Sequence, residues 1–345
     1  MWRVSLSLIT HRFFLLVVAL AAIHFQGLQN NPSVPSPGVS GIPGLWSQFL
    51  QRVSNSREAQ EISSPQSTSK DPFIFFGSWI YRFSQIRPEI IVLVLSNLFL
   101  FLFLLELNGF VNSLALPEVA VDTCLMSILW LTSYELSLGS SLSLSCFLTL
   151  LALKAANDHR WLISGIALAL LSLTQLIGLF LLPLLLVIWL GQQKYSSRDE
   201  LYKRLIYLLV PISSVIFFRW DFYRNTPQMI HASAFFNLLN VFHLETGFSW
   251  ALSTSFLGQT LALLVLLSGS IISFFVLSTL LHRLMPIVLL LSLLITTPYT
   301  ELATSTLLVA PAFTGFAEAC APSLLKGMQL LFLIFGAIEV FNIFS

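Results

Sequence analysis

The stretch EIIVLVLSNLFLFLFLLEL, residues 89–107, has a glutamate near each end and an interior built almost entirely of Ile, Val, Leu and Phe. A helix needs roughly 20 apolar residues to cross a hydrocarbon core of about 30 Å, and backbone groups without hydrogen-bond partners are excluded from that core. The stretch therefore predicts a membrane-spanning helix.

The whole chain has the same apolar character. Of its 345 residues, 56% are hydrophobic, 10% are charged and 30 are Phe. Soluble domains carry about 25% charged residues and less than half apolar residues, so the composition excludes an ordinary soluble protein. The formal net charge of +1 gives no broad basic field, which excludes nucleic acid as a partner.

Similar apolar runs recur along the chain and predict an all-α fold. We expect a polytopic membrane protein with about eleven transmembrane or re-entrant helices in a single membrane domain over residues 1–345. Several runs are shorter than a full crossing and can be tilted, re-entrant or packed against neighbours. The first run also fits a cleavable signal peptide, but no small-x-small cleavage site closes it, so we expect a retained helix. The predicted helices lie near residues 13–25, 89–107, 119–136, 138–153, 161–174, 176–190, 204–218, 257–281, 285–297, 302–316 and 324–343.

Two polar stretches, residues 26–73 and 219–250, interrupt the apolar runs and predict long loops. An excess of Lys and Arg in short loops marks the cytosolic side of a membrane. With a cytosolic N-terminus, strict alternation of the helices places both long loops on the opposite, non-cytosolic side, and we expect the aromatic segment Phe73–Phe83 to lie at the membrane interface. The basic residues that this register places in the cytosol are Lys154, Arg160, Lys194, Arg198, Lys203, Arg204, Arg283 and Lys326.

The chain contains no motif of an ATPase, a metalloprotease, a serine hydrolase or a kinase. Its three cysteines form neither a CxxC pair nor a zinc spacing, so we expect no disulfide, no metal and no cofactor. Carboxylates in or near lipid are costly and are therefore functional candidates, although each can instead pair with Arg, Ser or backbone at a helix end. The acidic residues in this position are Glu106, Glu118, Asp122, Glu135, Glu301, Glu318 and Glu339.

The loop 219–250 interleaves aromatic and charged residues at both of its ends. Such a surface suits contact with lipid head groups, and an ordinary aromatic belt at the membrane boundary is the alternative reading. Arginine can pair with phosphate, and tryptophan can stack on a sugar.

The region from Leu93 to Trp189 resembles the membrane core of GT-C glycosyltransferases, multi-span enzymes that use polyprenyl-phosphate sugars on the lumenal side. The features that carry this resemblance are the succession of spans, a Ser-Tyr-Glu-Leu-Ser turn at 133–137, a hairpin at 154–161, and Leu173-Thr174-Gln175 leading to Leu182-Pro183.

Within that superfamily, most of the chain is similar to the PIG-U-type subunit of the glycosylphosphatidylinositol (GPI) transamidase. The order of short motifs carries the similarity: Trp46, Ser64-Pro65, Pro72-Phe73, Trp220-Asp221-Phe222, Gly247-Phe248-Ser249-Trp250 and Pro298-Tyr299-Thr300. The chain departs from the family pattern at Ala251-Leu252-Ser253, where the family has aromatic and acidic residues, and it lacks the family's Gly-Asp after the last motif.

This resemblance implies a non-catalytic membrane subunit of the endoplasmic reticulum that helps bind the GPI lipid, with other transamidase subunits as partners and no catalytic residue of its own. The lipid- or glycan-binding residues that it implies lie at the lumenal rim: Arg219, Trp220, Asp221, Phe222, Arg224, Gly247, Trp250, Pro298, Tyr299 and Glu301.

The alternative is a PIG-V-like GPI mannosyltransferase that uses dolichyl-phosphate mannose, since Thr132-Ser133-Tyr134-Glu135 resembles a turn of that family. Activation of an acceptor hydroxyl needs a carboxylate within reach of the donor. That base is expected soon after Trp46, and the first acidic residue after it is Glu58. The missing base favours a binding role over catalysis. A transporter or scramblase is disfavoured because the chain shows no internal repeat.

Overall fold

A computed structural model describes residues 72–84, 88–113, 117–129, 141–175, 177–192, 204–214, 216, 254–277, 280–296 and 306–344 of the chain. Within these ranges the protein is built from helices and contains no β-strand, which confirms the all-α prediction for this part of the chain. The first predicted helix and both long predicted loops, apart from the last two residues of 26–73, lie outside the described residues.

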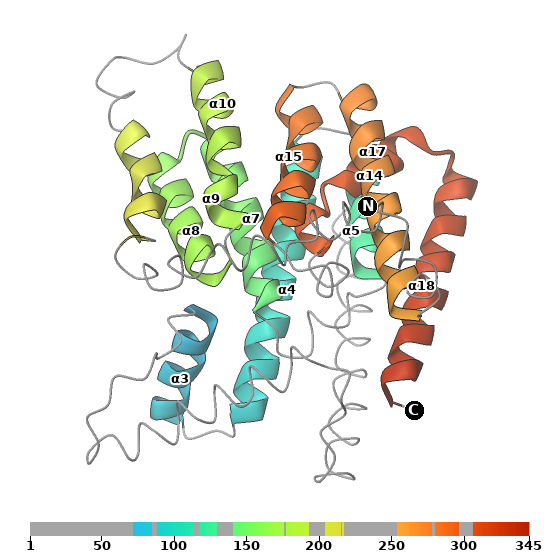
Figure 1. Cartoon of the computed structure of the whole chain (residues 1–345), viewed down its shortest axis with the longest axis horizontal. Helices are drawn as coiled ribbons and strands as arrows, with labels where there is room; N and C mark the ends of the chain where they lie inside the picture. The colour runs from blue at the N-terminus through green and yellow to red at the C-terminus, as the bar shows by residue number, and fades with distance from the viewer. Residues whose placement is uncertain are drawn as a thin grey trace, which may run out of the picture.

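The described helices are mostly short and apolar (Figure 1). They are α3 (Pro72–Ser84), α4 (Pro88–Asn112), α5 (Pro117–Leu129), α7 (Leu142–Asn157), α8 (Trp161–Thr174), α9 (Ile177–Phe180), α10 (Leu182–Gln192), a helix over Arg204–Ser214, α14 (Thr254–Val276), α15 (Leu280–Thr296), the 3-10 helix η3 (Thr306–Val309), α17 (Ala312–Ala319) and α18 (Pro322–Phe344).

Proline sets the starting points of four of these helices. Pro72, Pro88, Pro117 and Pro322 are the first residues of α3, α4, α5 and α18. The fixed φ of proline suits the first helical position, and its missing N–H costs nothing there because the first N–H groups of a helix have no intrahelical acceptor. The same chemistry interrupts the predicted helix 302–316. That prediction is wrong within 306–316, where η3 ends before Pro311 and α17 begins after it.

Helices α4 and α7 run in the same direction. The rings of Phe99 and Phe147 stack with centroids 6.2 Å apart. Seven residues further along each helix, Lys154 Nζ lies 2.6 Å from Glu106 Oε2. Equal steps along both helices between these two contacts require a parallel pair, and a seven-residue spacing brings the same face of each helix back to the interface.

Hydroxyl side chains join α7 to α8 as an antiparallel hairpin. Ser164 Oγ donates a hydrogen bond of 2.8 Å to the carbonyl of Ala152, and Ser145 Oγ lies 3.2 Å from Thr174 Oγ1 near the other end of the pair. The turn between the helices places His159 at a φ of 62°, where the backbone N–H groups of the turn bond the last carbonyls of α7. The chain is thereby reversed within three residues.

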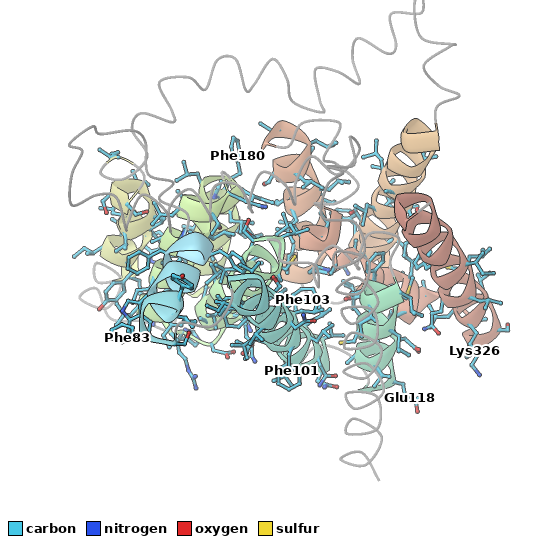
Figure 2. The ribbon with its side chains drawn as sticks, turned by 90° about the horizontal axis from the view of Figure 1, so that it is seen from below. Phe83, Phe101, Phe103, Glu118, Phe180 and Lys326 are labelled. Atoms are coloured by element: carbon cyan, nitrogen blue, oxygen red, sulfur yellow. The ribbon has the colours of Figure 1, made fainter. Side chains whose placement is uncertain are left out.

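The exposed faces of the helices differ from those of a soluble bundle, because they are largely apolar like the interior. On α4 the exposed positions before the terminal Asn112 are apolar: in Figure 2, Phe101 lies on the outer margin with 38% of its surface exposed, whereas Phe103 lies within the bundle with 1% exposed. Meanwhile, many buried positions are hydroxylic. The buried Ser and Thr residues are Ser96, Thr123, Ser127, Ser143, Ser145, Thr149, Ser164, Ser172, Thr174, Ser270, Ser273, Ser292 and Thr314.

One helix of the described part, α4, contains a stretch long and apolar enough to cross a membrane, Val94–Asn112. The other apolar stretches among the residues whose side chains the structure describes, such as Ala262–Val276 in α14, are 10–17 residues long. The all-helical architecture is therefore established for the described residues, and the number of crossings stays a prediction.

Candidate polar site across four helices

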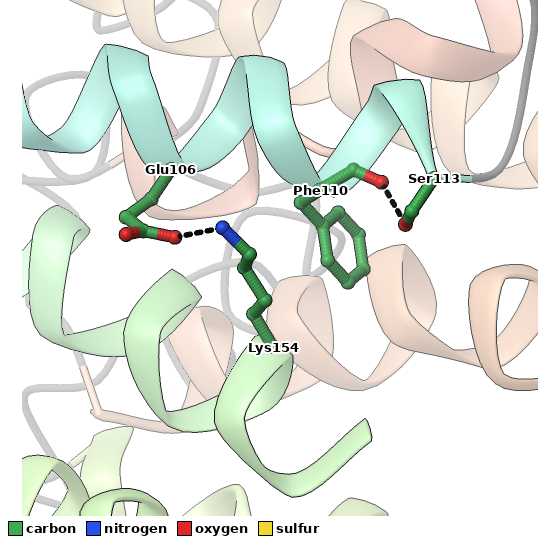
Figure 3. A network of polar contacts seen from close by, with 4 residues as sticks. All are labelled: Glu106, Phe110, Ser113 and Lys154. Atoms are coloured by element: carbon green, nitrogen blue, oxygen red, sulfur yellow. Dashed lines mark hydrogen bonds and ion pairs between the residues drawn. The ribbon is translucent and has the colours of Figure 1, made fainter. Parts of the chain in front are cut away.

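An ion pair joins the parallel helices α4 and α7 near their C-terminal ends. Lys154 Nζ lies 2.6 Å from Glu106 Oε2, and the Lys154 and Glu106 side chains are 32% and 25% exposed (Figure 3). Glu106 lies on α4 and Lys154 on the last turn of α7. Because the charges are only partly exposed, each depends on the other for solvation more than a surface pair does.

Gly109 makes room for the lysine. It lies one turn after Glu106 on α4, and a β-carbon at this position would stand 3.0 Å from Lys154 Nζ. Residues three apart on a helix share a face, so the glycine leaves a recess beside the carboxylate into which the ammonium group fits. The pair is therefore built by three residues: an acid, a small residue one turn later, and a cation from the neighbouring helix.

A second polar contact joins α5 to α18. Gln329 Nε2 donates a hydrogen bond of 3.1 Å to Asp122 Oδ1. Asp122 is half-buried, and the amide gives its carboxylate a donor that water would otherwise supply. This contact connects residues 207 positions apart in the chain.

The two contacts lie at the same level of the bundle. Helices α4 and α5 form an antiparallel hairpin in which Cys124 Sγ lies 3.8 Å from the carbonyl of Leu104. Two residues before Cys124 is Asp122, and two residues after Leu104 is Glu106, so equal steps of about 1.5 Å per residue keep these carboxylates level. We call the set Gln329, Asp122, Glu106 and Lys154 the polar layer; it crosses α18, α5, α4 and α7 in that order.

The polar layer accounts for two of the seven predicted acidic candidates. Glu118 lies exposed at the start of α5 (Figure 2), where a negative charge favours the helix N-terminus, and Glu318 lies exposed near the end of α17. Glu135 and Glu301 lie outside the described residues, and of Glu339 the structure describes only its place in α18.

The ten residues predicted to bind lipid or glycan, which fall in 219–250 and 298–301, all lie outside the described residues. The structure therefore leaves that lumenal site as a prediction. Cys124, Cys146 and Cys320 are free thiols, and among the described residues no three His, Cys, Asp or Glu side chains are grouped so that they can hold a metal ion.

Sequence reasoning named Glu106 and Asp122 but missed their partners. It placed Lys154 in a cytosolic loop, whereas the structure places it in the last turn of α7 against Glu106. Gln329 carried no signal because a single amide in an apolar helix is common. A lysine inside the apolar pattern of residues 142–157 is the one feature that pointed to a partner on another helix.

Comparison with known proteins gives no further support for any assignment. No family model matches the chain, and no curated protein or solved structure matches it.

Proposed function

We propose that the protein is a multi-span helical membrane protein with a GT-C-like arrangement. The observation that carries the membrane assignment is the polarity of the described helices, whose exposed faces are lined by Leu, Ile, Val and Phe, while buried Ser, Thr and Gly lie among the apolar side chains of the interior. Lipid is the solvent that accepts such exposed faces. Within lipid the hydrophobic effect does not drive helices together, and small residues favour their association by allowing close packing.

The directions of the helices support the predicted topology. Alternating crossings require α4 to run toward the cytosol, α5 to return and α7 to run toward the cytosol again. The parallel pair α4 and α7, with the antiparallel α5 and α8, agrees with this order. In this register the Glu106–Lys154 pair lies about 9 Å inside the cytosolic end of α4, close to the exposed turn Asp158-His159-Arg160.

For the biological role, we propose a non-catalytic subunit of the GPI transamidase in the endoplasmic reticulum membrane that helps hold the GPI lipid while another subunit attaches it to protein. The support is the order of the short motifs from Trp46 to Pro298-Tyr299-Thr300. A membrane-embedded bundle is the setting in which acyl chains can be held, and the aromatic and cationic residues of 219–250 are chemically suited to phosphate and sugar.

Two experiments test the two levels of the proposal. Alkaline carbonate washing of membranes that contain the full-length tagged chain is expected to leave it in the membrane pellet, and its release would reject the membrane assignment. Purification in mild detergent is expected to bring down the transamidase subunits, and cells without the protein are expected to accumulate complete GPI lipid that is not attached to protein.

Recovery of the chain without those subunits, together with normal attachment of GPI anchors in its absence, would reject the transamidase role. Accumulation of an incomplete GPI precursor lacking a mannose would instead favour the mannosyltransferase alternative. In that case the triple change of Glu58, Glu61 and Asp71 to alanine should abolish the transfer, because these are the first acidic residues after Trp46.

A further inference from the structure

Helix α3 folds back along the first half of α4. Ser84 ends α3 four residues before Pro88 begins α4, and near the other end of α3 the buried ring of Phe73 lies 6.3 Å from that of Phe99. In Figure 1 the two helices lie side by side with their axes nearly parallel. The pair is therefore an antiparallel hairpin in which Phe73 is level with Phe99.

The outer face of α3 is aromatic. Trp79 is 56% exposed and Phe83 is 75% exposed, and their rings meet edge to face with centroids 4.9 Å apart. Phe75 and Phe76 are also exposed and contact each other. We call Phe75, Phe76, Trp79 and Phe83 the aromatic patch. The opposite face of α3, which includes Phe73 and Gly77, is buried against the bundle.

The hairpin register places the aromatic patch at one end of the apolar stretch of α4. Trp79 follows Phe73 by six residues, so it is level with position 93, six residues before Phe99. The apolar run of α4 begins at Ile90, directly after Glu89, which this register places level with Phe83. At about 1.5 Å per residue, Trp79 lies about 6 Å and Phe76 about 10 Å to the apolar side of the level of Phe83.

We propose that the aromatic patch of α3 binds the lipid head-group boundary and sets the depth of the bundle in the bilayer. Trp and aromatic rings are enriched at this boundary because a flat ring accepts both acyl chains and hydrated head groups. The patch covers about 12 Å along the helix axis, so it reaches from the head-group zone, which is about 5–8 Å deep on one side of a bilayer, into the adjoining acyl chains.

Continuity with the lipid-facing side of α4 favours lipid over a protein partner. The exposed residues Val94, Leu98, Phe101 and Leu105 recur at helical spacing and form an apolar stripe on α4. Figure 2 places Phe83 and Phe101 on the same outer margin of the molecule. A surface that begins with the aromatic patch and continues as a stripe that is aliphatic except for Phe101 follows the change from head groups to acyl chains.

This inference rests on the membrane assignment above, and one experiment separates the two. Single cysteines are introduced as Trp79→Cys, Phe83→Cys, Leu98→Cys and His159→Cys in a full-length chain whose native cysteines are changed to Ala or Ser, and each is spin-labelled in lipid nanodiscs. Collision rates with oxygen, which concentrates in acyl chains, and with a water-soluble nickel chelate report the depth of each label. Leu98 is the exposed acyl-chain reference and His159 the exposed aqueous reference.

The oxygen-to-nickel ratio at positions 79 and 83 is expected to fall between the two references, with position 79 deeper than position 83. Low access to both reagents would mean that protein covers the patch and would overturn the inference, as would a ratio equal to that of His159. In both cases a high ratio at Leu98 keeps the membrane assignment. A water-like ratio at Leu98 would overturn the assignment and the inference together.

Discussion

Gly315 on α17 packs directly against Ser273 on α14. A β-carbon at Gly315 would overlap the Ser273 hydroxyl and would stand 2.6 Å from its backbone nitrogen. Ser273 Oγ in turn donates a hydrogen bond of 3.4 Å to the carbonyl of Ala312 on the same side of α17. One turn before Ser273, a β-carbon at Gly269 would stand 2.7 Å from the Phe316 ring and 3.0 Å from the carbonyl oxygen of Ala312. Small residues four apart on α14 thus let the short, buried α17 reach the backbone of its neighbour.

We therefore expect Gly315→Ala to destabilise the protein even though alanine is the better helix former. The methyl group meets backbone rather than a movable side chain, so α14 and α17 must separate, at a cost of about 1–3 kcal/mol. Thermal unfolding in detergent measures the effect. Gly327→Ala on α18 is the matched control, because nothing lies within 4 Å of the added carbon; that change should be neutral or stabilising by up to about 1 kcal/mol. Equal effects of both changes would contradict the contact.

The Glu106–Lys154 pair predicts a non-additive pair of substitutions. Glu106→Gln and Lys154→Met should each lower the free energy of unfolding by about 1–2 kcal/mol, between the values for exposed and buried pairs, because each leaves a half-buried charge without its partner. The double variant should lose less than the sum. Denaturation of the wild type, the two single variants and the double variant under one condition gives the double-mutant cycle. Strictly additive losses of unfolding free energy would mean that the two charges are independent.

Two substitutions of Asp122 distinguish a structural role of the polar layer from a functional one. Asp122→Asn keeps an oxygen that accepts the hydrogen bond from Gln329 and removes a charge, so the stability of the protein should be unchanged or slightly higher. Asp122→Leu should cost about 1–2 kcal/mol because the Gln329 amide loses its acceptor. Attachment of GPI anchors to a reporter, the readout of the proposed function, is measured in parallel. A stable Asp122→Asn protein without activity would show that the carboxylate itself is needed.

The three cysteines provide a test of sidedness. Cys124 and Cys146 are buried, and Cys320 is partly exposed in the turn between α17 and α18. A membrane-impermeant maleimide added to sealed microsomes is expected to label Cys320 alone, because the proposed topology places this turn in the cytosol. Cys320→Ser is the control and should abolish the native signal. Labelling only after permeabilisation would mean that the orientation is inverted.

Much of the local structure follows from the order of residues alone. The apolar run 89–107 predicted a helix, and the structure extends it to Pro88–Asn112; the run 161–174 matches α8 at both ends. Sequence reasoning failed at 302–316, where Pro311 interrupts the helix although the apolar pattern continues. Hydropathy averages over side chains, whereas a single missing N–H acts on one hydrogen bond of the backbone.

The sequence predicted the two carboxylates of the candidate site but not their partners. Glu106 and Asp122 stood out because carboxylates are costly in an apolar run. Their partners did not, because a hydrogen bond between Gln329 and Asp122 depends on how α5 and α18 meet, and nothing local to either helix determines that meeting.

By itself, the sequence determined that the chain folds into apolar helices and where several of them begin, because backbone hydrogen bonding and proline chemistry act within one turn. Only the tertiary structure decided that α4 and α7 run in parallel, that Lys154 meets Glu106 beside Gly109, and that the polar layer spans four helices. Such contacts join distant residues through packing, and packing is a property of the whole bundle rather than of any single segment.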